Sequence, residues 1–256
     1  MNASDIERFI ADGYLHVEQA FERATAKACV EILWELMGID RHDRASWTQA
    51  VVRVPGSIAP PFLDAINSSR LVEVIDTLLG AGRWLPRTVG YGTFPIRFPS
   101  EVDPGDTGWH IDGSFGEAPW YRVNFVSKGR ALLLLMLFSD VGVDDAPTRI
   151  RVGSHLDVAP SLAGVGDGGC VFDIRRASAA LERPIVSATG RAGDVFVCHP
   201  FLVHAASWPH RGISPRFVGQ PCVHHAAGEW IGGFDYGRPD PSPVEQAVLR
   251  AIATPR

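Results

Sequence analysis

The segment TGWHIDGS, residues 107–114, carries a histidine and an aspartate two positions apart, His110 and Asp112. Side chains at positions i and i+2 of a β-strand point to the same face of a sheet. On a strand, one imidazole and one carboxylate therefore lie side by side, while Ile111 faces the opposite way. The pattern predicts a strand that directs two metal ligands into the interior of a β-barrel.

A second segment, GDVFVCHPFLVHAAS at residues 193–207, supplies candidates for a third ligand. Its Gly-Asp turn is followed by β-branched and aromatic residues, which favour a strand. His199, His204 and the later His210 are the candidates. Two histidines and one carboxylate form a facial triad, which leaves three positions of an Fe(II) ion open for a bidentate keto acid and O₂.

The HxD pattern alone is a weak signal, because a second copy occurs at His155 and Asp157. Residues 113–203 leave room before His204 for several strands of ~5–6 residues, whereas residues 158–203 would be cramped. The second copy also follows a Val-Gly-Ser turn at the edge of the expected sheet. The spacing therefore favours the first copy as the ligand pair.

Periodicity along the rest of the chain predicts a mostly β protein with flanking helices. A capping-box pattern at Ser4 and Glu7 predicts a first helix that ends at Gly13, and a strand follows at 14–17. Apolar residues at helical spacing predict further helices over 22–37 and from Ser68 or Ser69 to 79, and Ser242-Pro243 begins a last one. Short apolar segments separated by turn residues predict strands at 87–94, 107–112, 131–138, 148–152, 185–187, 194–199 and 216–225.

These elements favour a double-stranded β-helix, that is, a jelly-roll or cupin-like barrel with helices packed on one outer face. We expect a single domain over residues 1–256. Within it, residues 1–82 form a mainly helical N-terminal part, residues 83–228 the jelly-roll core, and residues 229–256 the segment with the C-terminal helix.

Composition excludes several classes of function. The net charge is −5, and no Lys/Arg run occurs, so a nucleic-acid partner is not expected. The longest apolar run, 131–138, is far shorter than the ~20 residues that cross a bilayer, and no signal peptide precedes it. The four cysteines are widely spaced, which favours reduced thiols. We expect a cytoplasmic protein with a small-molecule substrate; its oligomeric state stays open.

Beyond His204, Arg216 opens the next predicted strand, where its planar guanidinium can pair with the distal carboxylate of a keto acid. Arg211 is the alternative, but its position in a loop favours a solvated side chain. Arg97 precedes the HxD segment and is either a ligand for an anionic substrate or cosubstrate, or a surface charge. The aromatic residues around the HxD segment either belong to the core or line an apolar substrate pocket; they are Trp109, Phe115, Trp120 and Tyr121.

Five stretches together resemble the phytanoyl-CoA dioxygenase family of Fe(II)/2-oxoglutarate oxygenases. They are FIADGYLHVEQAF, GWHIDGS, LLLLMLFSDV, APTRIRVGSH, and GDVFVCHPFLVHAAS followed by Arg216. The resemblance implies Fe(II) held by His110, Asp112 and His204, with 2-oxoglutarate and O₂ as cosubstrates. It also implies that Arg216 binds the 2-oxoglutarate carboxylate and that Leu135, midway along the long apolar strand, lines the cosubstrate pocket.

The chain departs from the family pattern at two positions. Ala206 stands where the family usually has a serine that touches the cosubstrate, and Val152 replaces the usual proline before Gly-Ser-His. Related halogenases replace the ligand carboxylate by a small residue, so the presence of Asp112 favours hydroxylation. The resemblance thus implies a dioxygenase that hydroxylates an unactivated C–H bond of a small metabolite and releases succinate and CO₂. The alternatives are a cupin-like metalloenzyme that does not use 2-oxoglutarate and a catalytically inactive binding protein.

Overall fold

The structure is a computed structural model that describes residues 1–88, 92–117, 120–227 and 232–253. Its larger sheet is antiparallel, with strands in the order β1 (Tyr14–Val17), β8 (Val195–Cys198), β5 (Leu132–Leu137), β11 (Cys222–His225) and β3 (Trp84–Leu85); β10 (Val218–Gly219) also pairs with β5. A smaller sheet has the order β7 (Ile185–Ser187), β6 (Arg149–Arg151) and β9 (His204–Ala205), and β2 (Val51–Pro55) pairs with β4 (Thr93–Arg97).

Strand β5 lies at the centre of the molecule, and all of its side chains are buried. One face, with Leu134 and Met136, packs into the core cluster that the helices complete. The other face, with Leu133 and Leu135, packs with Ile150 of the smaller sheet. Because both faces are covered, the strand is a continuous apolar run without alternation. The predicted jelly-roll core with flanking helices is confirmed, although the sheets do not close into one continuous barrel in the described part of the chain.

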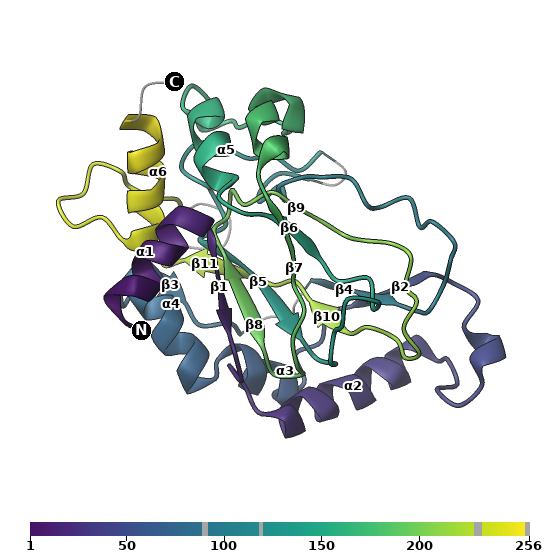
Figure 1. Cartoon of the computed structure of the whole chain (residues 1–256). Helices are drawn as coiled ribbons and strands as arrows, with labels where there is room; N and C mark the ends of the chain where they lie inside the picture. The colour runs from purple at the N-terminus through teal and green to yellow at the C-terminus, as the bar shows by residue number, and fades with distance from the viewer. Residues whose placement is uncertain (89–91, 118–119, 228–231, 254–256) are drawn as a thin grey trace.

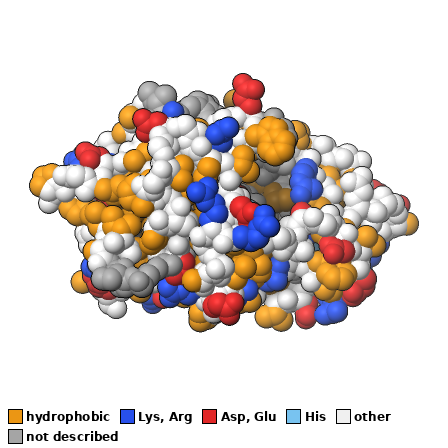
Figure 2. Space-filling view, turned by 90° about the horizontal axis from the view of Figure 1, so that it is seen from above, with side chains coloured by type: hydrophobic (Ala, Val, Ile, Leu, Met, Phe, Trp, Pro, Cys, Tyr) orange, Lys and Arg blue, Asp and Glu red, His pale blue; other side chains and the backbone are white. Residues whose placement is uncertain are grey.

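Helices cover the outer face of the larger sheet. In Figure 1, α1 (Ala3–Asp12), α4 (Ser69–Leu79) and α6 (Pro243–Ala253) gather at one side of this sheet, and α2 (Arg23–Met37) and α3 (Pro60–Ile66) run beneath it. Helix α5 (His155–Leu162) and the 3-10 helix η2 (Ile174–Glu182) follow strand β6, and a short 3-10 helix, η1 (Arg44–Ser46), follows α2. None of the described helices is both long and apolar enough to span a membrane. Seen from above in Figure 2, the surface is hollowed near its centre, and basic and acidic side chains border the hollow.

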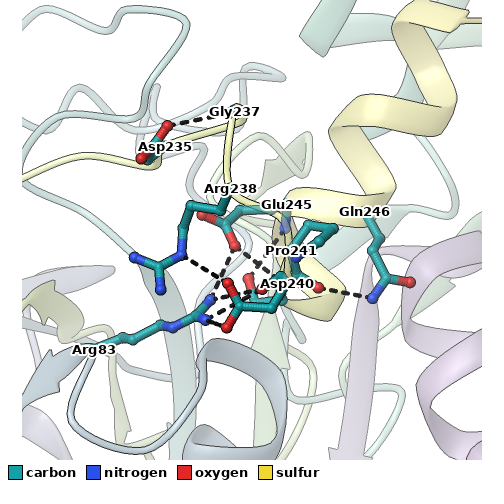
Figure 3. A network of polar contacts seen from close by, with 9 residues as sticks. Arg83, Asp235, Gly237, Arg238, Asp240, Pro241, Glu245 and Gln246 are labelled. Atoms are coloured by element: carbon teal, nitrogen blue, oxygen red, sulfur yellow. Dashed lines mark hydrogen bonds and ion pairs between the residues drawn. The ribbon is translucent and has the colours of Figure 1, made fainter.

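Polar contacts hold the C-terminal helix α6 in place. Ser242 and Glu245 form a reciprocal cap at the start of α6, because each backbone N–H donates to the side chain of the other. Arg83, just after α4, reaches both Asp240 and Glu245 (Figure 3). These contacts tie α6 to the loop that follows α4, so the last helix is docked on the fold.

Most predicted elements are present, and the differences are local. The strand at 14–17 and the helices over 22–37, 69–79 and from 243 are confirmed. The first helix is capped by Asn2 and Asp5, so the expected box at Ser4 and Glu7 is wrong; Glu7 instead pairs with Arg250 of α6. Within the expected strand at 107–112, His110 makes one isolated bridge and no ladder. The expected strand at 87–94 falls partly outside the described residues. Strand β2 and helix α3 are present but were not predicted.

The second HxD copy lies in the core, at the start of α5. His155 is fully buried, and its ring lies 4.7 Å from that of His199. Gly13 has a positive φ of 82° and ends α1 so close to this ring that a Cβ there would lie 2.4 Å from Nδ1 of His155. Asp157 pairs with Arg183 at 2.7 Å. The motif therefore has a structural role here, as does His199, whose ring contacts the carbonyl of Val244.

These two histidines make stability depend on pH. Burial lowers the pKa of His155 to about 4 and that of His199 well below its usual range, so both rings are neutral in the folded state. The unfolded chain binds protons at these sites below about pH 6.5, so stability falls as the pH drops from 6.5 toward 4. We expect up to about 1.4 kcal/mol per pH unit for each histidine, measured by denaturant unfolding. The free energy of unfolding is expected to change less steeply with pH in His155→Leu than in wild type. The control His42→Leu, at an exposed histidine, should match wild type. Equal pH slopes in all three proteins would contradict the role of His155.

Candidate metal centre

Three predicted ligands converge at one point between the HxD segment and the start of β9. A ring nitrogen of His110, a ring nitrogen of His204 and a carboxylate oxygen of Asp112 all lie within 4.8 Å of one another. The Oδ1 atom of Asp112 is 3.6 Å from Nε2 of His110 and 3.7 Å from Nε2 of His204. Among the described residues this is the one such group of three or more ligand side chains, and neither His199 nor His210 belongs to it.

Backbone pairing brings the two imidazoles together. The N–H of His110 donates to the carbonyl of His204 at 3.0 Å, and the N–H of His204 donates back at 2.9 Å. Each Nδ1 atom also lies against a carbonyl oxygen, Gly108 at 2.8 Å for His110 and Leu202 at 3.1 Å for His204. When Nδ1 donates to a carbonyl, the lone pair is on Nε2, which faces the carboxylate. Both rings are therefore oriented to offer Nε2 to a cation.

The charge states also suit a metal ion. Burial alone would raise the pKa of Asp112, but Arg130 and the two histidines hold it far below its usual range. Burial lowers the pKa of His204, so this ring is neutral at pH 7. For His110, burial opposes the charged form, but Asp112 raises its pKa overall. A bound metal ion would take the place of a proton on the His110 ring, and the donor set of two imidazoles and one carboxylate fits Fe(II).

A cavity of about 330 Å³ adjoins this centre and contains both imidazoles in its lining. Arg97 and Arg216 also line it, and their backbones are paired by hydrogen bonds of 3.2 and 2.8 Å. The remaining lining residues are Arg53, Thr93, Pro95, Asp106, Thr148, Ala206 and Gln220. The cavity therefore joins the two imidazoles to a cationic region.

The two buried arginines differ in their partners. Arg97 is 3% exposed and pairs with Asp106 at 2.6 Å, and Arg53 shares the same carboxylate at 2.9 Å. Arg216 is 2% exposed and donates through Nη1 to the carbonyl of Ala146, but no carboxylate of the described residues lies within 4 Å of its guanidinium. Burial and the neighbouring Arg97 lower the pKa of Arg216 to about 9. Asp106 and Asp145 act on this guanidinium from farther away, so Arg216 has carboxylates in its neighbourhood but no direct ion pair among the described residues.

Other candidates from the sequence are placed as follows. Arg97 is not a surface charge, whereas Arg211 is exposed and pairs with Glu101. Leu135 is fully buried between the two sheets and is not among the residues that line the cavity, so its role in the cosubstrate pocket stays a prediction. Of the aromatic residues around the HxD segment, Trp120 and Tyr121 are exposed and Phe115 is buried.

Sequence reasoning missed the residues that hold the HxD segment in place. Arg130 contacts Asp112 at 3.0 Å, and no motif marks this arginine at the start of the apolar run. The guanidiniums of Arg149 and Arg151 both lie over the ring of Trp109, 4.6 and 4.4 Å from its centroid. The i, i+2 spacing of these arginines on β6 was the one available signal. This spacing predicts that the two arginines share a face of the strand, but it does not predict their contact with the indole of Trp109.

Solved structures of low sequence identity share this fold. The epimerase SnoN, in complex with Fe3+, alpha ketoglutarate and nogalamycin RO, is 20% identical over 86% of this chain and 82% of that chain, with a TM-score of 0.59. EctD from S. alaskensis, with 2-oxoglutarate and 5-hydroxyectoine, is 18% identical over 94% and 82%, with a TM-score of 0.60. The carbocyclase SnoK from nogalamycin biosynthesis is 18% identical over 94% and 92%, with a TM-score of 0.56.

No curated protein sequence is a significant match to the chain. The model of one protein family, described as phytanoyl-CoA dioxygenase (PhyH), matches residues 9–216. The match extends from helix α1 to Arg216, so it includes the HxD segment and the stretch with the distal histidine. The chain belongs to the phytanoyl-CoA dioxygenase family.

Proposed function

We propose that the chain is an Fe(II)- and 2-oxoglutarate-dependent dioxygenase that hydroxylates an unactivated C–H bond of a small molecule. One observation carries the proposal: the cavity that contains His110 and His204 also contains a buried Arg216 without a carboxylate partner among the described residues. A dicarboxylate bound there satisfies the guanidinium with one carboxylate and directs its keto-acid end toward the imidazoles. In the overall reaction, substrate, 2-oxoglutarate and O₂ give hydroxylated substrate, succinate and CO₂.

Each residue has a distinct part in this proposal. His110, Asp112 and His204 would hold the iron, and three protein ligands would leave coordination positions for a keto acid and O₂. Arg216 binds the distal carboxylate of 2-oxoglutarate, while Arg97 and Arg53 keep the surrounding potential positive. Once bound, the iron and its cosubstrates supply the oxidation, and the protein supplies position and a site shielded from water.

Hydroxylation is the reaction that the ligand set favours, because Asp112 occupies the position that related halogenases leave open. The fold itself does not decide the product, since structural neighbours include an epimerase, a carbocyclase and a protein solved with 5-hydroxyectoine. The proposed substrate is a small molecule, and the net charge of −5 argues against a nucleic-acid partner. All four cysteines are free thiols, which accords with the proposed cytoplasmic location.

A spectroscopic titration tests the proposal. Fe(II) and then 2-oxoglutarate are added anaerobically, and we expect the weak visible charge-transfer band of a chelated keto acid. Product analysis with candidate substrates then separates hydroxylation from other oxidations. Tight metal binding without the band would favour a cupin-like metalloenzyme that uses no keto acid. Failure to bind stoichiometric metal would favour a catalytically inactive binding protein.

A further inference from the structure

The two oxygens of the Asp112 carboxylate have different neighbours. Oδ1 lies 3.6 and 3.7 Å from the Nε2 atoms of the two histidines. Oδ2 lies 3.0 Å from Nη1 of Arg130, a contact between opposite charges in which the Asp112 side chain is 30% exposed. One oxygen is thus the closer one to the two imidazoles, and the other is the closer one to a guanidinium.

Arg130 is itself held in place on several sides. Its side chain is 12% exposed, and Nη2 donates to the carbonyl of Gly113 at 3.2 Å. Its backbone N–H donates to the carbonyl of Ser127, and the hydroxyl of Ser127 donates to its carbonyl. The buried strand β5 begins two residues later. The guanidinium thus contacts Asp112 through Nη1 as an ion pair and the carbonyl of the next residue through Nη2, while neither Nε nor Nη1 makes a hydrogen bond to the described residues.

We propose that Arg130 is a positioning residue that keeps Asp112 a one-oxygen ligand, an inference that rests on the proposed metal centre. A carboxylate that binds through both oxygens occupies two coordination positions instead of one. With two histidines already bound, only two positions would then remain, too few for a bidentate keto acid together with O₂. By engaging Oδ2, Arg130 keeps the third position open. The positive charge of Arg130 also offsets the negative charge of Asp112, which weakens the electrostatic attraction of the site for a cation.

The arrangement predicts opposite effects on two affinities when Arg130 is replaced by methionine. The methionine variant loses the cation beside the site and releases Oδ2, so its affinity for the metal should be unchanged or higher. Binding of 2-oxoglutarate to the metal-loaded protein weakens, by about 10- to 100-fold, the range usual for outer-shell partners of a ligand. General damage to the site would weaken both. The two dissociation constants are measured separately, the metal one without any cosubstrate.

Infrared difference spectra of metal-loaded minus metal-free protein give a readout that does not depend on activity. The separation between the two carboxylate stretching bands distinguishes one-oxygen from two-oxygen binding, and we expect it to narrow in Arg130→Met. Arg130→Lys keeps the charge without the planar fork, and its band separation is expected to lie between those of wild type and Arg130→Met. This variant also provides a test if the methionine variant does not fold. Arg122→Met, at an exposed arginine that contacts only backbone carbonyls in the described structure, is the control and should match wild type.

Parallel weakening of metal and 2-oxoglutarate binding, or unchanged carboxylate bands in both Arg130 variants, would overturn the proposal. Its failure can be told apart from failure of the proposed function. If wild-type protein binds metal but forms no keto-acid chelate, the dioxygenase assignment fails, while the metal-only infrared comparison still decides what Arg130 does. If the chelate forms in wild type and the carboxylate bands do not change, the dioxygenase assignment stands and the positioning role is wrong.

Discussion

Replacing His110 with alanine is expected to abolish stoichiometric Fe(II) binding and, with it, the keto-acid band. In the proposed centre His110 is one of three protein ligands, and its Nε2 atom lies 3.6 Å from Oδ1 of Asp112. Loss of an inner ligand removes a direct bond to the metal, so the affinity should fall by more than the 10- to 100-fold typical of outer-shell changes. Metal content after anaerobic gel filtration and a competition titration with a chelator measure the effect.

The chain contains its own matched control, because His155 also begins an HxD motif. His155→Ala should retain full metal binding but lose stability, since it empties a fully buried site next to Gly13 and His199. A loss of about 2–5 kcal/mol is typical for truncation of a large buried side chain. Thermal unfolding of the metal-free protein should therefore separate the two variants. If His155→Ala loses metal and His110→Ala keeps it, the choice between the two motifs is wrong.

The comparison of these motifs shows which features the sequence could predict. The i, i+2 rule selected the pair that the structure places beside His204, although the segment is not a regular strand. His110 and Asp112 converge because a single pair of backbone hydrogen bonds joins His110 to His204 and because Arg130 holds the carboxylate. The proximity of the His110 and Asp112 side chains follows from their i, i+2 spacing along the chain. The contact with Arg130 depends on how the start of β5 meets the HxD segment, which no local pattern encodes.

The same distinction applies to the fold. The apolar run of β5 and the helical spacing of α2 and α4 are local signals strong enough to decide the element type. Strand β2 and helix α3 carry only short apolar stretches, and α3 begins with two prolines that resemble a turn. Arg97 illustrates the limit for single residues: its burial depends on the pairing of β4 with the Arg216 segment and on Asp106, contacts that bring distant parts of the chain together.

Arg216 is expected to lower the stability of the cosubstrate-free protein and to raise it when 2-oxoglutarate is bound. Its guanidinium is buried, without a carboxylate within 4 Å among the described residues, and burial together with Arg97 lowers its pKa to about 9. The group nevertheless stays charged at pH 7, so the folded protein bears the cost of a buried, poorly compensated cation. A bound carboxylate would remove that cost and add a charge-assisted contact.

Arg216→Met should therefore reverse the order of stabilities. Without cosubstrate, the variant is expected to unfold at a higher temperature than wild type. With metal and saturating 2-oxoglutarate, wild type becomes the more stable protein because ligand binding to the folded state adds stability. Loss of a buried charge pair typically costs about 2–5 kcal/mol, so the half-saturating 2-oxoglutarate concentration should rise by at least about 30-fold, with metal affinity unchanged. The control, Arg211→Met, changes an exposed arginine on the same loop and should alter neither quantity. An unchanged 2-oxoglutarate requirement in Arg216→Met would remove the cosubstrate role from this residue, and a parallel loss of metal binding would place its effect on the centre itself.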